Sequence, residues 1–192
     1  MGRPSNRDAR RAEILAAFSR VLADHGYAGA TIAAIAREAD VAPGLIHHHF
    51  DDKEDLLTSL LGELVRRFRV RVRERVDGGD ALAAYVDGAL KLDERADVTA
   101  ARCWVGLFSE ALRNPVLFKQ MRSLIDTEIA AIQTRSGSEL DSRDAGAVLA
   151  FVVGALVVGA FAPRKTSGFA APALHRFVEG LRVGARARAL VE

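Results

Sequence analysis

The chain has 192 residues, of which 49% are hydrophobic and 27% are charged, so one large or two small domains can bury a sizeable core. Its formal net charge of +2 does not indicate a general polyanion-binding protein. The single cysteine, Cys103, excludes an intrachain disulfide and a four-cysteine metal site, and it favours a reducing compartment.

The amino-terminal segment, MGRPSNRDARR, is polar and rich in arginine, with no apolar stretch of the kind found in a secretory signal. We therefore expect a cytoplasmic protein. This segment is basic, because it has one acidic residue, Asp8, and four arginines: Arg3, Arg7, Arg10 and Arg11. Two interpretations stay open: a basic arm that contacts DNA phosphates or a minor groove, and a solvated tail.

The segment from Thr31 to Leu57 predicts two short helices, a tight turn and the start of a third helix. Thr31 can cap the first helix, whose apolar residues recur at helical spacing: Ile32, Ile35, Ala36 and Ala39. Residues 40–42 form the turn, and Pro43 suits the first position of the second helix because its missing N–H is no loss there. Gly44 has no side chain, so DNA can approach the backbone closely.

This pattern resembles the helix-turn-helix of TetR-family repressors, and the resemblance runs from about Ile14 to Leu57. The residues that carry it are Ile14, Leu15, Phe18, Leu22, His25-Gly26-Tyr27, Thr31, Ile35-Ala36, Ala39, Val41, Gly44, His48-His49-Phe50, Lys53 and Leu56-Leu57. Two residues depart from it: Asp40 replaces the usual turn glycine, and Ala42 replaces a serine cap. Asp tolerates a left-handed backbone. Pro43 partly offsets the lost cap, which costs about 1 kcal/mol of helix stability.

The resemblance implies a role for each exposed position of the head. Bases and nearby backbone would face Ala42, Pro43, Gly44, Leu45, His47 and His48, while phosphates would be gripped by Thr31, His49 and Lys53. The second helix carries no Arg, Asn or Gln. Specificity should therefore depend on histidine contacts, on apolar contacts with thymine methyl groups and on DNA shape.

The three consecutive histidines, His47 to His49, suggest a metal site as an alternative. Consecutive helical residues point about 100° apart, so three in a row cannot bind one ion, and we expect no metal and no cofactor. The chain also shows no catalytic triad order, no phosphate-binding glycine loop and no paired carboxylates, so we do not expect an enzyme. A metal-dependent enzyme would purify with stoichiometric metal.

Helix signals continue to the end of the chain, and no strand pattern or repeat accompanies them. A helix of about 25 residues begins at Asp52, and its arginines, from Arg66 to Arg75, are expected to form a solvated face. Turn and cap residues then divide the rest into helices over 80–94, from Asp97 or Thr99 to Arg113, 115–135, from Asp141 or Ser142 to Pro163, and 172–190. We predict an all-α fold of nine helices, with three in a head (residues 1–51) and six in a body (residues 52–192).

The uncharged apolar run from Ala145 to Ala162 could cover about 27 Å as a helix, which is the short limit for a bilayer. It lacks the aromatic residues that flank membrane spans. A membrane-anchored regulator, which would need detergent, therefore remains only an alternative. In TetR-like proteins the last two long helices form the dimer interface, so the resemblance implies a homodimer that reads a palindromic operator and involves no membrane.

The segment from Ala101 to Pro115 is where we expect a small-molecule effector to bind. Its candidate pocket residues, with walls from later helices, are Trp104, Phe108, Glu110, Phe118, Met121 and Phe151. Core packing alone also explains such an aromatic stripe. This segment, together with Gly44-Leu45-Ile46 and His48 of the head, is similar to the subgroup of choline-responsive betaine-synthesis repressors. The similarity implies that Trp104 and Phe108 receive a quaternary ammonium by cation–π contact, with Glu110 adding charge. The effector, the operator and the sign of regulation stay open.

Overall fold

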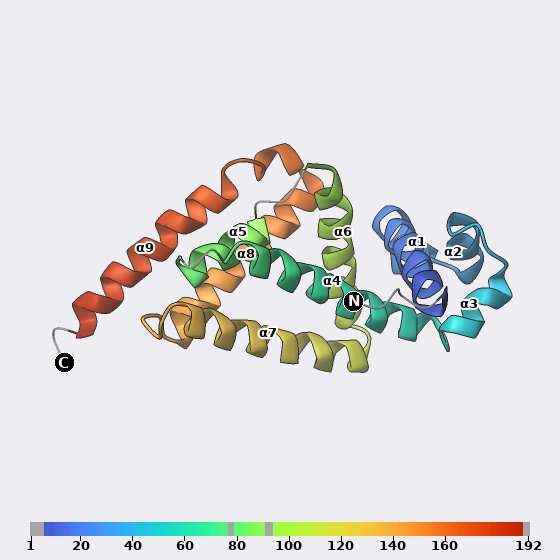
Figure 1. Ribbon diagram of the computed structural model, residues 1–192, viewed down its shortest axis with the longest axis horizontal. Helices are drawn as coiled ribbons and strands as arrows, with labels where there is room; N and C mark the ends of the chain where they lie inside the picture. Colours follow the sequence, from blue (N-terminus) through green and yellow to red (C-terminus); the bar gives the residue numbers. More distant parts are fainter. Residues whose placement is uncertain (1–5, 77–78, 91–93, 190–192) are drawn as a thin grey trace.

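The computed structural model describes residues 6–76, 79–90 and 94–189, and within them the chain is all-α (Figure 1). As predicted, three helices form the head and six form the body of this described part. The helices are α1 (Asn6–Gly29), α2 (Ile32–Glu38), α3 (Pro43–His49), α4 (Lys53–Glu74), α5 (Ala81–Leu90), α6 (Glu94–Ala111), α7 (Pro115–Arg135), α8 (Ser142–Phe161) and α9 (Ala170–Ala189), with a short 3₁₀ helix, η1 (Pro163–Lys165), before α9.

The head lies at one end of the molecule, and α4 runs from it into the body (Figure 1). α6 packs against α1 on one side and against α8 on another, while α9 extends to the end opposite the head. One cluster of buried residues joins α1 to α4 with α6 and the start of α7, and a second joins the end of α4 with α5, α7, α8 and α9. The first cluster crosses residue 51, so the division into 1–51 and 52–192 stays a prediction.

The helix boundaries of the head follow from single residues. Gly26 has φ 66°, which kinks α1 at the predicted corner. The Thr31 hydroxyl accepts a hydrogen bond from the Ala34 N–H at 3.1 Å, which confirms the predicted cap of α2. Asp40 has φ 53° in the turn, and Pro43 begins α3 after an Ala42 that makes no side-chain cap.

Side-chain caps and residues with positive φ also set the limits of two helices of the body. The Asn114 side chain accepts from the Leu117 N–H at 2.8 Å at the start of α7. Gly137 and Ser138 have φ 67° and 63° in the predicted break after α7, and Asp141 caps α8 with acceptor distances of 2.8 Å. The predicted limits of α7 and the start of α8 are therefore confirmed.

Two predicted starts in the body were wrong. α6 begins at Glu94, so Asp97 and Thr99 lie inside the helix. No residue between Glu94 and Thr99 breaks a helix, so the helix continues through Asp97 and Thr99 and neither residue caps it. α9 begins at Ala170, which puts Pro172 in its first turn, where the missing N–H is not needed. The predicted end of the helix over 80–94 was also wrong, because α5 is described only to Leu90 and Glu94 already belongs to α6.

The predicted amino-terminal arm also needs correction. Arg7, Arg10 and Arg11 belong to α1, while Arg3 lies outside the described residues. The Arg11 guanidinium lies 4.0 Å from the centre of the Phe50 ring, and it donates to the His49 carbonyl and, at 2.7 Å, to the Ser59 hydroxyl. Arg11 therefore joins α1 to the end of α3 and the start of α4, and is neither a free arm nor a tail.

Candidate DNA-binding surface and ligand cavities

One side of α3 is anchored in the core and the other is exposed. Ile46 is fully buried and Phe50 is 2% exposed, so the helix cannot roll without breaking the head core. The opposite side exposes Ala42, Pro43, Gly44, His47 and His48, with Leu45 half-buried beside them. A methyl group added at Gly44 would meet no protein atom within 4 Å. The fold itself therefore does not require glycine there.

The three predicted phosphate contacts lie in different surroundings. Thr31 is exposed at the start of α2. His49 is only 8% exposed, and its Nδ1 has no hydrogen-bond partner among the described residues. Lys53 donates to the Tyr27 carbonyl, with its Nζ 3.9 Å from the centre of the Tyr27 ring. Among the three, only Thr31 presents its side chain outward in this structure.

The surroundings of His49 and Lys53 also change how they ionise. Burial, followed by the charges of His48 and nearby arginines, lowers the pKa of His49. Burial lowers the pKa of Lys53, although the charge of Glu110 acts in the opposite direction. To contact a phosphate, Lys53 would have to leave Tyr27, and the imidazole of His49 would have to move out of its buried position. This differs from the sequence-based expectation, because the local sequence does not indicate that Tyr27 of α1 binds Lys53 or that His49 is buried.

An inner cavity of about 80 Å³ lies in the body, where α6 faces α4, α5, α7 and α8. Trp104 and Phe108 of α6 line it with their ring centres 6.0 Å apart, and Met121 of α7 lines it as well. The remaining lining residues are Val65, Phe68, Arg71, Tyr85, Ala89, Leu124, Ile125, Glu128, Leu149, Val152, Val153 and Leu156. The structure thus brings three of the six candidate pocket residues to one cavity.

The other three candidates do not line this cavity. Glu110 lies two residues after Phe108, about 200° around the helix, and its charge acts on Tyr27 and Lys53 of the head. Phe118 is 48% exposed on α7. Phe151 stacks on Phe177 of α9, with ring centres 6.2 Å apart. Placement on the same helix was therefore not enough to predict which side chains share a cavity.

Sequence reasoning also missed the one carboxylate of the inner cavity. Glu128 is 8% exposed, and its Oε1 lies 3.7 Å from the Arg69 guanidinium. Burial, together with the charge and the hydrogen bond of Glu128, raises the pKa of the Tyr85 hydroxyl. The sequence could have indicated that Glu128 is buried, because it lies four residues from both Leu124 and Ile132, within an apolar stripe of α7.

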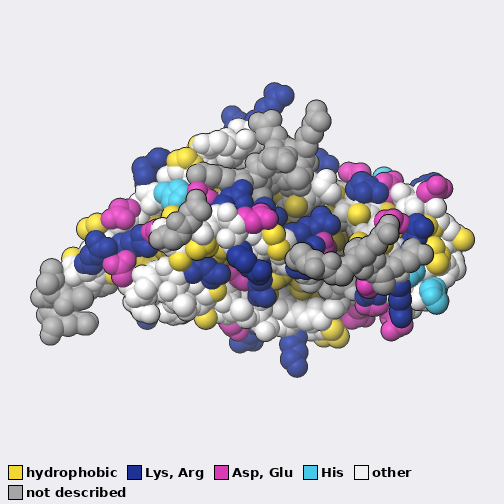
Figure 2. Space-filling view, in the orientation of Figure 1, with side chains coloured by type: hydrophobic (Ala, Val, Ile, Leu, Met, Phe, Trp, Pro, Cys, Tyr) yellow, Lys and Arg dark blue, Asp and Glu magenta, His cyan; other side chains and the backbone are white. Residues whose placement is uncertain are grey.

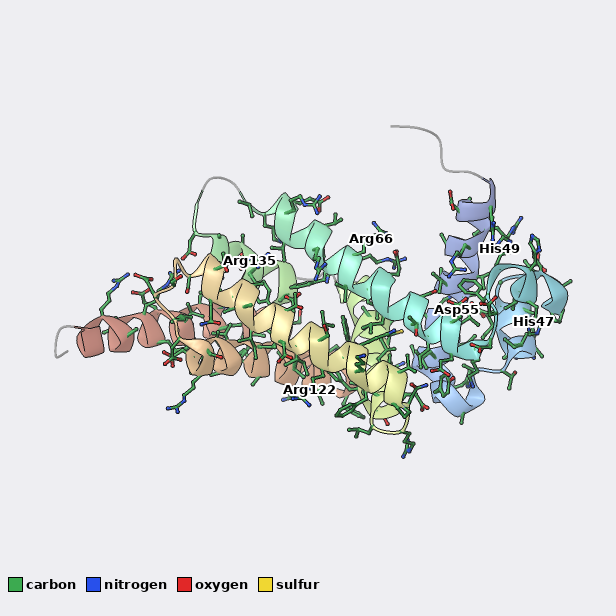
Figure 3. The ribbon with its side chains drawn as sticks, turned by 90° about the horizontal axis from the view of Figure 1, so that it is seen from below. His47, His49, Asp55, Arg66, Arg122 and Arg135 are labelled. Atoms are coloured by element: carbon green, nitrogen blue, oxygen red, sulfur yellow. The ribbon has the colours of Figure 1, made fainter. Side chains whose placement is uncertain are left out.

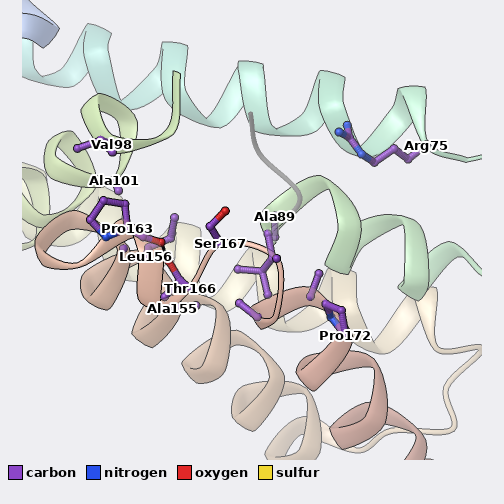
Figure 4. Close-up of a pocket in the computed structure, with 15 residues that line it drawn as sticks. Arg75, Ala89, Val98, Ala101, Ala155, Leu156, Pro163, Thr166, Ser167 and Pro172 are labelled. Carbon is purple, nitrogen blue, oxygen red and sulfur yellow. Dashed lines mark hydrogen bonds between the residues drawn. The ribbon is translucent and has the colours of Figure 1, made fainter. Parts of the chain in front are cut away.

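A larger outer cavity of about 550 Å³ opens where α5, α6, α8, η1 and the start of α9 meet (Figure 4). Small and apolar residues line most of it, with Arg75 and the hydroxyl-bearing Thr166 and Ser167 at its wall. Ala89 and Leu156 line both this cavity and the inner one. Only these two side chains are shared, so they form the wall between the two spaces.

Large apolar side chains of α8, of α9 and of Phe169, the residue just before α9, stay uncovered. Those exposed by more than a third are Val157, Val158, Phe161, Phe169, Phe177 and Val183. By length and composition, α8 is also the one described helix that could cross a membrane, and 22% of its apolar window is buried. Within the fold it packs against α6 and α7. No group of three His, Cys, Asp or Glu among the described residues could hold a metal ion.

The sequence suggested that the arginines of α4 form a solvated face, but several of them bind other groups of the protein. Arg66 and Arg67 pair with Glu63 at 2.7 and 2.6 Å. Arg71 donates to the Gly88 carbonyl at 3.1 Å, and Arg75 donates to the Arg71 carbonyl at 3.0 Å. The run therefore helps to hold α4 against α5. Figure 2 shows several Lys and Arg side chains near the middle of the molecule, where α4 and α7 run.

Residues 14–60 match the family profile described as bacterial regulatory proteins, tetR family. This range covers the head from α1 into α4. The HTH-type transcriptional regulator BetI of Stenotrophomonas maltophilia is 32% identical over 119 residues, which cover 59% of this chain and 60% of the relative. BetI of Burkholderia cenocepacia is 28% identical over 116 residues, covering 58% and 59%. The matches thus span about three fifths of the length of these relatives.

Residues 14–60 therefore carry the amino-terminal DNA-binding domain of the TetR family. Solved structures agree with the TetR fold over nearly the whole chain. A transcriptional regulator from Rhodococcus sp. RHA1 has a TM-score of 0.79 at 24% identity, with 91% of this chain and 96% of that one covered. A regulator from Saccharomonospora viridis, solved in complex with choline, has a TM-score of 0.73 at 22% identity, with 90% and 96% covered. At such identities these likenesses show the TetR fold alone.

Proposed function

We propose that this TetR-family protein is a homodimeric transcriptional regulator, most simply a repressor, that binds a palindromic operator and releases it when the body binds a small molecule. The observation that carries the proposal is the exposed side of α3. Ile46 and Phe50 hold the helix in the core, while Gly44 and His47 face outward without a packing role. A short helix held in this way suits insertion into a major groove. Because genomic DNA is the partner, the protein would act in the cytoplasm.

The proposed contacts divide into two kinds. Ala42 and Leu45 offer methyl groups to thymine, and His47 and His48 offer ring nitrogens to bases or phosphates. Thr31 offers a hydroxyl to a phosphate. Lys53 would join the complex only after leaving Tyr27, and His49 only after leaving its buried position, so we assign them a secondary role in phosphate binding.

Dimerisation is supported by the exposed apolar side chains of α8, of α9 and of Phe169 just before α9. Phe161 is 79% exposed and Phe169 is 53% exposed, which is costly for a protein that remains a monomer. A second copy related by a two-fold axis would cover the same patch on both chains and place two heads on successive major grooves.

Effector binding is supported by the inner cavity beside Trp104 and Phe108. An apolar, aromatic cavity with few polar groups is a common form of small-molecule site. The Saccharomonospora viridis neighbour was solved with choline, which makes choline one compound to test against this chain.

The test is to sequence the genomic DNA fragments that the purified protein retains at near-physiological salt. We expect a recurrent palindrome with wild type, and its loss in a His47→Ala/His48→Ala double variant. His25→Ala is the matched control, because His25 is an exposed histidine of the head outside α2 and α3. Absence of any enriched sequence with wild type, or a palindrome that the double variant retains at full strength, would contradict the proposal.

A further inference from the structure

α4 and α7 run side by side (Figures 1 and 3). A groove lined by residues of both helices follows them on the surface. Its first part has a volume of about 540 Å³ and begins near the head. Its second part, about 360 Å³, continues toward Arg135 at the far end of α7. Both parts are lined by Arg69, Arg73 and Thr127, so they form one continuous groove.

Arginine is the main charged residue of this groove. Arg66, Arg69 and Arg73 line it from α4, at spacings of three and four residues that place them on one helical face, and Arg135 lines it from α7. Glu128 is the only acidic residue in its described lining. Polar groups that can bind an anion accompany the arginines: Thr58, Gln120, Ser123 and Thr127.

The hydrogen bonding of Gln120 and the ion pair of Glu128 indicate which ligand charge suits the groove. Gln120 has a buried Oε1 with no hydrogen-bond partner among the described residues. Turning this amide would direct its N–H₂ group there in place of the oxygen, which gives a donor that a ligand can use. The carboxylate of Glu128 already lies 3.7 Å from the Arg69 guanidinium, and its charge acts on the Tyr85 hydroxyl. Glu128 is therefore committed to protein partners and is a poor counter-ion for a bound cation.

The groove and the inner cavity share their walls. Val65 and Leu124 line both the first part of the groove and the inner cavity. Phe68 and Glu128 line both the second part and the inner cavity. An apolar, aromatic space thus lies directly beneath an arginine-lined surface, with one layer of side chains between them. A molecule with an apolar end and a charged end could occupy both sites once side chains of this layer, such as Val65 and Leu124, move apart.

We propose that the effector is an amphipathic anion, with its apolar part in the inner cavity beside Trp104 and its negative head group at Arg69 and Arg73 of the groove. The proposal rests on the proposed function, because it names the ligand class of the body. It differs from the cation that the betaine-synthesis resemblance implies. A quaternary ammonium would lie near several guanidinium groups, whereas a carboxylate or phosphate ester would be attracted to them.

Trp104 is the only tryptophan in the chain, so its fluorescence reports on the inner cavity directly. We would titrate the full-length protein, at low ionic strength, with three probes of equal chain length: octanoate, 1-octanol and octyltrimethylammonium. We expect octanoate to change the Trp104 signal with an apparent Kd at least tenfold lower than that of octyltrimethylammonium. Added salt should reduce this difference, because it screens the arginines.

Arginine variants locate the head group. Arg73→Gln should weaken octanoate binding at least threefold, and Arg69→Gln/Arg73→Gln at least tenfold, while 1-octanol binding stays within twofold. Arg122→Gln is the matched control, since Arg122 is an exposed arginine of α7 that does not line the groove or the inner cavity (Figure 3). Thermal unfolding of each variant confirms that it is folded.

Three results would overturn the inference: equal or tighter binding of octyltrimethylammonium, no response of Trp104 to any probe, or octanoate binding that the arginine variants leave unchanged. The fragment-sequencing experiment is independent of all three. A protein that retains a palindrome but prefers the cation would keep the proposed function and lose this inference.

Discussion

The head and the body differ in how completely their own residues cover apolar side chains. In the head, Phe18 and Ile46 are fully buried and Phe50 is nearly so, and together they fix the position of α3. In the body, Phe161 remains 79% exposed, and Trp104 borders a cavity. The head is thus packed to hold one surface rigid, whereas the body keeps spaces and faces that a ligand and a second copy could cover.

The largest effect that would test this difference is the loss of a head core side chain. Phe50→Ala removes a ring that is 2% exposed and that supports the Arg11 guanidinium, so unfolding free energy should fall by about 3–5 kcal/mol. Phe118→Ala, at a residue that is 48% exposed, should change it by less than about 0.5 kcal/mol. Urea denaturation measures both. Equal losses would mean that the head is not the more tightly packed region.

A pair of glycines tests packing in the body. A methyl group at Gly88 would lie 2.7 Å from the Val72 Cγ2 and 2.9 Å from the Val72 Cα, where α5 crosses α4. Gly88→Ala should therefore destabilise the protein by about 1–3 kcal/mol. Gly62→Ala, which meets nothing within 4 Å on α4, should instead stabilise it by up to about 1 kcal/mol. Stabilisation by both substitutions would show that α4 and α5 are not in close contact.

The cap of α2 links stability to the exposed surface. Thr31→Ala removes the acceptor for the Ala34 N–H and should cost about 1 kcal/mol of stability. Because the same hydroxyl is our proposed phosphate donor, affinity for the selected palindrome should fall as well, whereas Thr31→Ser should retain both properties. Thermal unfolding and fluorescence anisotropy with labelled duplex provide the readouts. A Thr31→Ala protein of unchanged stability would argue against the cap.

The smallest effect concerns acid stability of the head. Burial lowers the pKa of His49 below its ordinary value of 6.5, so the unfolded chain takes up the proton first as the pH falls. The stability that neutral His49 contributes is thus complete above about pH 6.5 and declines as the pH falls toward the folded pKa. The urea midpoint should drop less between pH 7 and pH 5 in His49→Gln than in wild type. His25→Gln, at an exposed histidine, should keep the wild-type slope.

Sequence predicted most where one residue acts locally. Thr31, Asp40, Pro43 and Asn114 each define a boundary through their own cap, φ angle or missing N–H, which neighbouring residues alone determine. This is why the all-α fold and most helix limits could be predicted. Asp97 was a wrong start signal because the helix already begins at Glu94, and a residue inside a helix cannot cap its first turn.

Tertiary placement was the part that the sequence could not give. The partners of Lys53 and Arg11 come from segments 26 and 38 or more residues away, so no local pattern indicates that these side chains turn inward. The cavity beside Trp104 likewise depends on how five helices meet. Glu110 and Phe151 were plausible by spacing, but they point to other neighbours once the helices are packed.

The most direct test of DNA reading by α3 is hydrogen–deuterium exchange of the protein with and without the palindrome selected from genomic fragments. We predict added protection in peptides that cover residues 31–50, and no added protection in α7 or α9. Protection confined to residues 66–75, the arginine-rich part of α4, or no protection anywhere in the head, would contradict this account.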